Sequence, residues 1–175
     1  NDLTGITATN IGTLTLDLQD AASTAAGTTG AINVGTANGV VVTGASDLNV
    51  NGAVTAATFN ASAATGAITI SALNATTAFT TGSGDDSLTS AGDTNFNVNG
   101  GAGNDTLVLA AQDYSNNTLT IANMEVLNIN ASGVTLAGSQ IHGQSYVISA
   151  DNAGDTLAIN ATVGTGETID VSGTA

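Results

Sequence analysis

The chain has 175 residues, with no lysine or arginine, 14 aspartate and glutamate residues and a single histidine. Nucleic acids and anionic membranes are bound mainly through Lys and Arg side chains, so this composition argues against both as partners. Because the carboxylates have no Lys or Arg to pair with, the compensating cations must come from outside the chain. That favours bound metal ions and an extracellular setting.

The apolar residues indicate a folded β protein. Hydrophobic residues make up 42% of the chain, which is more than disordered acidic segments contain. Val, Ile and Thr favour strands, whereas the abundant Asn and Gly favour turns. No apolar run approaches the roughly 18 residues of a membrane-spanning helix, so membrane insertion is not expected. Cysteine is absent, so disulfide bonds contribute nothing.

Short runs of alternating apolar residues recur along the chain and predict strands with one buried face. In chain order these runs are 11–18, 31–34, 40–42, 48–50, 67–70, 96–98, 106–109, 119–121, 126–130, 134–136, 146–148, 157–159 and 168–171. Residues 20–27 are expected to form a loop or a short turn of helix. The strands start roughly every 8 to 12 residues, a spacing that suits either a sandwich of hairpins or a parallel β-solenoid.

Two features favour the solenoid. Asn-Gly hairpin signals occur only at Asn38, Asn51 and Asn99, and not between most of the predicted strands. An Asn also follows several apolar runs, as at Asn60 and Asn130, where it can stack between coils. We therefore expect an all-β fold, a right-handed parallel β-solenoid or β-roll with short irregular turns, with a β-sandwich as the alternative. Residues 1–175 are expected to form one repetitive β domain of a longer protein.

One segment carries a specific motif. Residues 100–108, Gly-Gly-Ala-Gly-Asn-Asp-Thr-Leu-Val, match G-G-x-G-x-D-x-U-x, the nonapeptide of calcium-binding parallel β-rolls, at every specified position. The glycines permit a tight turn with positive φ that brings backbone carbonyl groups round a cation. Asn104 and Asp105 add side-chain oxygens, and Ca²⁺ takes six to eight oxygen ligands.

A looser copy of the motif, Thr-Gly-Ser-Gly-Asp-Asp-Ser-Leu-Thr, occupies residues 81–89. Asp86 precedes Asp105 by 19 residues, and two nine-residue half-turns make a coil of about 18. The two turns are therefore expected on one edge of adjacent coils, with one Ca²⁺ between them. The extra residue must lie in a turn, because a slip within a strand would reverse its faces. The predicted calcium-turn residues, within a region of about 81–108, are Gly82, Gly84, Asp85, Asp86, Gly101, Gly103, Asn104 and Asp105.

Three further carboxylates are secondary candidates. Asp93 lies in the degenerate half-coil between the two motif copies and is expected to bind calcium weakly or not at all. Asp151 and Asp155 belong to a third, incomplete copy that lacks the first pair of glycines. The alternative interpretation of all these turns is an acidic β-turn that holds no metal.

The glycine–aspartate repeats, the absence of Lys and Arg, and the Thr/Asn/Ala-rich strands resemble bacterial surface-layer proteins of the RTX class. Residues 123–129, Asn-Met-Glu-Val-Leu-Asn-Ile, are similar to the I-E-x-L-N-[IL] strands that recur in this family. The resemblance implies export by type I secretion, a calcium-loaded β-solenoid and assembly into a crystalline coat on the bacterial cell surface. This chain departs from long RTX arrays because only two clean repeats occur, which implies calcium at a few defined sites.

We therefore expect a structural subunit of an extracellular bacterial surface layer that folds with Ca²⁺ and self-associates into a lattice or filament. Other parts of the protein would contact cell-surface glycan or lipopolysaccharide. No catalytic residues are predicted, because a lone His142 and the absence of Lys, Arg and Cys leave few reactive groups. Two alternatives stay open: a calcium-dependent adhesin or filament subunit, and an accessory module of a secreted enzyme.

Overall fold

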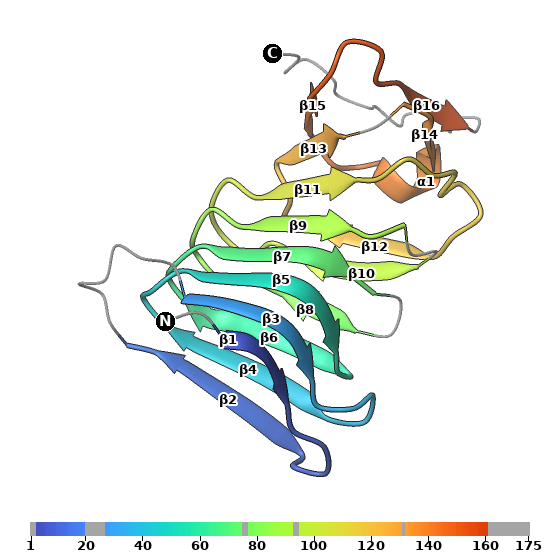
Figure 1. Cartoon of the computed structure of the whole chain (residues 1–175). Helices are drawn as coiled ribbons and strands as arrows, with labels where there is room; N and C mark the ends of the chain where they lie inside the picture. Colours follow the sequence, from blue (N-terminus) through green and yellow to red (C-terminus); the bar gives the residue numbers. More distant parts are fainter. Residues whose placement is uncertain (1–2, 20–26, 75–76, 93–94, 131, 161–175) are drawn as a thin grey trace.

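A computed structural model describes residues 3–19, 27–74, 77–92, 95–130 and 132–160. They form a β-solenoid of about 6 turns, in which the chain winds back and forth between two facing sheets (Figure 1). Every strand pair in these ranges is parallel. The predicted solenoid is thereby confirmed, and the β-sandwich of hairpins is excluded, since hairpin partners run antiparallel.

Three sheets make up the coil. The first sheet contains, in spatial order, β1 (Leu3–Thr7), β3 (Gly27–Asn33), β5 (Leu48–Thr55), β7 (Ile68–Leu73), β9 (Ser87–Ser90), β11 (Thr106–Leu109), β13 (Val126–Ile129) and β15 (Val147–Ala150). The second contains β2 (Thr13–Leu18), β4 (Gly39–Gly44), β6 (Thr58–Ala64), β8 (Ala78–Thr80), β10 (Phe96–Asn99) and β12 (Leu119–Ala122). A third pairs β14 (Val134–Ala137) with β16 (Leu157–Asn160), and the short helix α1 spans Gly138–Ile141.

The core consists of side chains that stack in columns along the solenoid axis. On the first sheet, register partners in five consecutive coils form one buried aliphatic column: Val50, Ile70, Leu88, Leu107 and Leu127. On the second sheet, Phe59 and Phe79 are register partners with ring centroids 5.9 Å apart. Each coil thus contributes one apolar residue per column, which explains the strict alternation in the sequence.

The predicted and observed elements differ where strands are short. Strands β1, β6, β8 and β9 lie outside the predicted runs, because each has at most two large apolar residues and so shows no clear alternation. The helix α1 was not predicted either. The loop or short helix was expected at 20–27, but residues 20–26 lie outside the described ranges and Gly27 already belongs to β3. The predicted strand 168–171 also lies outside the described ranges. No helix of the described part is long and apolar enough to cross a membrane.

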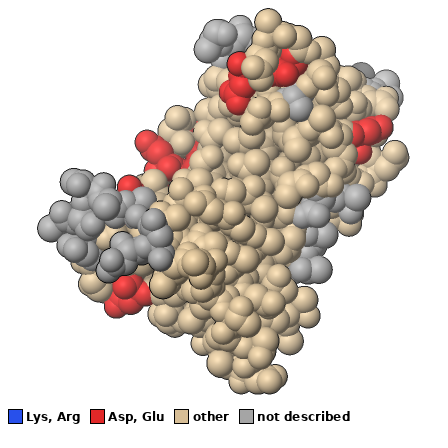
Figure 2. Space-filling view, viewed as in Figure 1, with Lys and Arg blue, Asp and Glu red and all other residues tan. Residues whose placement is uncertain are grey.

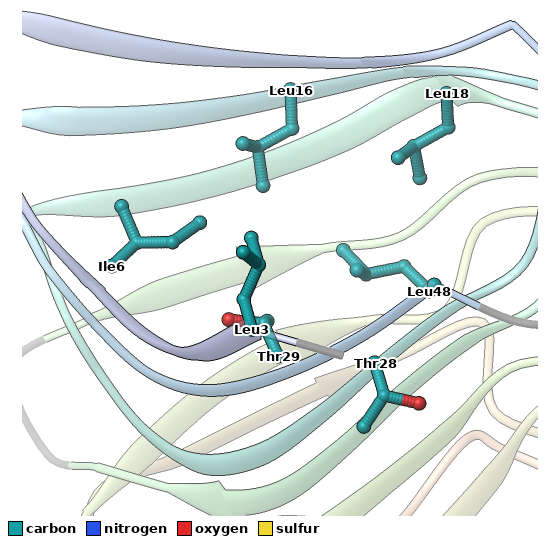
Figure 3. Close-up of a pocket in the computed structure, with 8 residues that line it drawn as sticks. Leu3, Ile6, Leu16, Leu18, Thr28, Thr29 and Leu48 are labelled. Atoms are coloured by element: carbon teal, nitrogen blue, oxygen red, sulfur yellow. The ribbon is translucent and has the colours of Figure 1, made fainter. Parts of the chain in front are cut away.

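A hollow of about 200 Å³ lies between the two sheets near the first strands (Figure 3). Its wall is apolar apart from two threonines and contains no ionisable group. The lining residues are Leu3, Ile6, Leu16, Leu18, Gly27, Thr28, Thr29 and Leu48. The hollow is therefore separate from the acidic turns.

Candidate functional site

Three acidic residues occupy equivalent positions on one edge of the solenoid. Asp86, Asp105 and Glu125 directly precede β9, β11 and β13, the strands that enter the first sheet. The first residues of these strands are register partners, so the three acidic residues lie above one another in three consecutive coils. We call them the carboxylate column.

Each side chain of the carboxylate column accepts a hydrogen bond from a backbone N–H of the preceding coil. Ile68 donates to Asp86 Oδ1 at 2.7 Å, and Asp86 donates to Asp105 Oδ1 at 2.8 Å. Asp105 donates in turn to Glu125 Oε2 at 2.8 Å. These bonds tie adjacent coils together at the point where each strand begins.

Asp105 is the most deeply buried member of the carboxylate column. Its side chain is 0% exposed, and its second oxygen, Oδ2, is buried without a hydrogen-bond partner. The pKa of Asp105 is raised to about 6, mainly because the side chain is buried. The hydrogen bond from the Asp86 N–H lowers this pKa, whereas the charges of Asp86, Glu125 and Asp85 add to the increase. An uncompensated buried carboxylate is costly, so this position calls for a counter-charge.

Gly100 packs directly against the unpartnered oxygen. A Cβ on Gly100 would collide with both Asp105 Oδ2 and the backbone oxygen of Asn123 in the next coil. A carboxylate oxygen and a carbonyl oxygen therefore converge beside Gly100, where only a residue without a side chain fits. This turn includes Gly101 at φ +95° and Gly103 at φ +136°, a region that favours glycine.

The predicted glycines of the two motif copies lie against one another. A side chain on Gly101 would collide with the backbone oxygen of Gly82, and one on Gly103 with that of Gly84. The strands that follow the two turns also pair in register, with Leu88 opposite Leu107. The prediction that the two turns sit on one edge of adjacent coils is therefore confirmed.

The remaining predicted residues of these turns divide into a buried and an exposed set. Burial raises the pKa of Asp86, against the lowering effect of hydrogen bonds from Ile68, Thr81 and Gly82. Asp85 and Asn104 are exposed, and the Asn104 N–H donates to Asp85 Oδ1 at 2.8 Å. The structure thus brings Asp86 and Asp105 together inside, and Asp85 and Asn104 together outside.

The secondary candidates do not join the carboxylate column. Asp93 lies outside the described residues. Asp151 and Asp155 follow the end of β15, whereas the carboxylate column precedes the strands of the first sheet. There, Asp151 accepts a hydrogen bond from the Asn128 side chain and Asp155 one from the Asn152 N–H, each at 2.8 Å.

The glycine–aspartate motif does not include two carboxylates on this edge. Glu125 has no glycine-rich turn before it, and Asp47 has no Gly-x-Gly-x-Asp pattern around it. Asp47 directly precedes β5 and accepts a hydrogen bond from the Ala67 N–H at 2.7 Å. A signal for Glu125 was present, because Asp86, Asp105 and Glu125 all occur in the pattern acidic–x–Leu.

The oxygen atoms around Asp105 suit a calcium ion. Calcium prefers carboxylate and backbone carbonyl oxygens, and Asp105 Oδ2, the Asn123 carbonyl and the neighbouring carboxylates are of these kinds. Among the described residues, no three His, Cys, Asp or Glu side chains converge as a metal cluster. A site here would therefore combine carboxylates with backbone carbonyls.

The acidic side chains on the surface lie in a few separate groups (Figure 2). On the face shown in Figure 2, the carboxylate atoms form separate groups on an otherwise uncharged surface. No positive side chain interrupts these groups, since the chain has no Lys or Arg. Local negative charge can therefore be compensated only by ions or by other molecules.

Comparison of the chain with protein-family models, with curated proteins and with solved structures finds no significant match. The function must therefore be inferred from the sequence motif and from the geometry of the carboxylate column.

Proposed function

We propose that this chain is a calcium-stabilised structural segment of an extracellular bacterial surface layer. The observation that carries the proposal is the buried carboxylate of Asp105, whose Oδ2 has no partner beside a glycine turn. Removing a carboxylate from water without a counter-charge is strongly unfavourable. Because the chain has no Lys or Arg, a metal ion from outside is the available counter-charge.

Asp86, Asp105 and the backbone carbonyls of the glycine turns would hold the ion. When bound, Ca²⁺ would supply positive charge next to carboxylates that otherwise repel one another. The chain itself contributes the arrangement: backbone N–H groups fix one oxygen of Asp86 and of Asp105. The glycines let the backbones of the two turns lie in close contact.

This arrangement would link folding to the calcium concentration outside the cell. Extracellular calcium modules bind with dissociation constants of about 10⁻⁴ to 10⁻³ M. An ion that binds only the folded state stabilises it by an amount that grows with ion concentration. A low-calcium cytoplasm would then leave the chain unfolded for export by type I secretion, and folding would follow outside.

The solenoid suits a structural role in a self-assembling layer. Apart from Asp17 on β2, its second sheet presents an outer face rich in small neutral side chains, among them the exposed residues Thr15, Asn60 and Asn97. When two copies pack through such a face, few carboxylates of one copy come close to those of the other. Packing is therefore possible although the chain carries a formal charge of −14. We propose further copies of the protein as the partners, with glycan or lipopolysaccharide contacts made by other parts of it.

Electron microscopy of the purified protein, refolded with and without calcium, tests this function. Two-dimensional arrays that form with Ca²⁺ and disappear on chelation would support a surface layer. Helical fibres would favour a filament subunit, and soluble monomers in both conditions would contradict the assembly role. Asp105→Asn provides the control, since it should abolish the calcium dependence of assembly.

A further inference from the structure

We infer that Glu125 is a calcium-binding residue of the carboxylate column, although it lies outside the glycine–aspartate motif. The inference rests on the proposed function, because it adds a side chain at the Asp105 end of the same site. It also extends the site over three coils, whereas the two motif copies span only two.

The fold places Glu125 directly beside Asp105. Glu125 precedes β13 as Asp105 precedes β11, and its Oε2 accepts the N–H bond of Asp105 itself at 2.8 Å. The turn before Glu125 has only residues 123–125 between its strands, against residues 100–105 in the coil before. This short turn brings the Asn123 carbonyl over Gly100, next to Asp105 Oδ2.

A second observation points to a ligand at this position. Asp105 is 0% exposed, and its Oδ2 has no partner on the protein. Because the Glu125 carboxylate is hydrogen-bonded to the Asp105 N–H, two acidic side chains of adjacent coils lie at one turn, and like charges so close repel each other. If Glu125 served only to accept a hydrogen bond, a neutral glutamine could accept it without that repulsion. An acidic side chain is favourable here when both carboxylates share a cation.

Asp47 offers a matched control for this reasoning. It also precedes a strand of the first sheet and accepts an N–H bond from an adjacent coil, from Ala67 at 2.7 Å. In the first sheet, however, β7 and β9 separate β5 from β11, the strand that follows Asp105. Asp47 therefore makes the same kind of hydrogen bond between coils as Glu125, but it does not lie next to the buried carboxylate of Asp105.

The test compares Glu125→Gln with Asp47→Asn in the full chain, since each variant removes one negative charge and can retain its hydrogen bond. Calcium affinity is measured by isothermal titration with CaCl₂ alone, and melting temperature is measured without divalent ions. Glu125→Gln should weaken calcium binding about tenfold or more, since even outer-shell partners of metal sites typically contribute 10–100-fold. It should also raise the melting temperature of the metal-free protein, whereas Asp47→Asn should leave calcium affinity unchanged.

Two results separate this inference from the function on which it rests. If the unaltered protein binds calcium and Glu125→Gln binds it equally well, the role of Glu125 is wrong and the proposed function stands. If the unaltered protein binds no calcium, the proposed function fails and this inference fails with it. If Glu125→Gln and Asp47→Asn lower the melting temperature of the metal-free protein equally, Glu125 acts only as a hydrogen-bond acceptor, and its role as a ligand is wrong.

Discussion

The backbone N–H of Asp86 donates a 2.8 Å hydrogen bond to the carboxylate of Asp105, its neighbour one coil further along the solenoid. The same relationship joins Asp105 to Glu125. The hydrogen bonds that join successive coils here are thus accepted by carboxylates, and the negative charges of these carboxylates repel one another. The stability of this part of the solenoid therefore depends on how that charge is compensated.

Asp105→Asn should stabilise the protein without calcium and abolish its response to calcium. The neutral side chain keeps the oxygen that accepts the Asp86 N–H, and its amide lies near the Asn123 carbonyl as an acceptor. Removing an uncompensated buried polar group should raise the free energy of unfolding by about 1–3 kcal/mol. Urea unfolding with and without Ca²⁺ measures both effects, and an equal loss of stability in the two conditions would refute them.

The metal-free protein should become more stable as the pH falls from about 7.5 to about 5. The pKa of Asp105 is raised in the folded state from 3.8 to about 6, so the folded form binds its proton more tightly than the unfolded form. The destabilisation is present above the folded pKa and is relieved as the pH falls through it, by an amount on the order of 1 kcal/mol.

Urea midpoints at the two pH values, on protein dialysed free of divalent ions, measure this dependence. Asp105→Asn should show a flatter pH profile than the unaltered protein, because it lacks the titrating group. In saturating calcium the trend should reverse, since protons then compete with the ion. A metal-free protein that loses stability on acidification, with no difference from Asp105→Asn, would show that Asp105 does not control the profile.

Gly84→Ala should destabilise the protein more than Gly133→Ala. A Cβ on Gly84 would stand 2.6 Å from the backbone oxygen of Gly66, so adjacent turns would have to separate, at about 1–3 kcal/mol or more. Gly133 has φ +89° but open space around it, so alanine there should cost only about 1–2 kcal/mol of backbone strain. Urea unfolding compares the two, and equal losses would argue against tightly stacked turns.

Phe59→Ala should destabilise the solenoid equally with and without calcium. Phe59 is 0% exposed and stacks with Phe79 at 5.9 Å between ring centroids. Truncating a buried aromatic side chain typically removes about 3–5 kcal/mol. The free energy of unfolding in both conditions is the measurement, and a loss confined to the calcium-loaded protein would mean that the core and the calcium turns are not independent.

The solenoid itself was predictable from the sequence, because alternate side chains of each short strand point into the core. The 19-residue spacing of Asp86 and Asp105 placed their turns in adjacent coils, and the register of Leu88 with Leu107 agrees. The third sheet and the helix α1 were not predicted. They depend on tertiary packing beyond β12, where the simple two-sheet alternation ends.

The candidate site was predictable only in part. The motif identified Asp86 and Asp105, because their glycines leave a clear signature in the sequence. Glu125 joins them through strand register, a long-range relationship that a local motif does not contain. The motif likewise does not say that Asp85 is exposed and Asp86 is buried, because this depends on the face of the turn on which each side chain lies.

The most direct test of the account is a calcium titration of the melting temperature, followed by circular dichroism, of the unaltered protein and of Asp105→Asn. Magnesium at equal concentration and ionic strength serves as the control, because any divalent ion screens a chain with a net charge of −14. The unaltered protein should gain about 5 °C or more at roughly 1–5 mM calcium and clearly less with magnesium, whereas Asp105→Asn should respond alike to both ions. An unaltered protein whose melting temperature does not change with calcium, or rises equally with magnesium, would contradict a calcium site at Asp105.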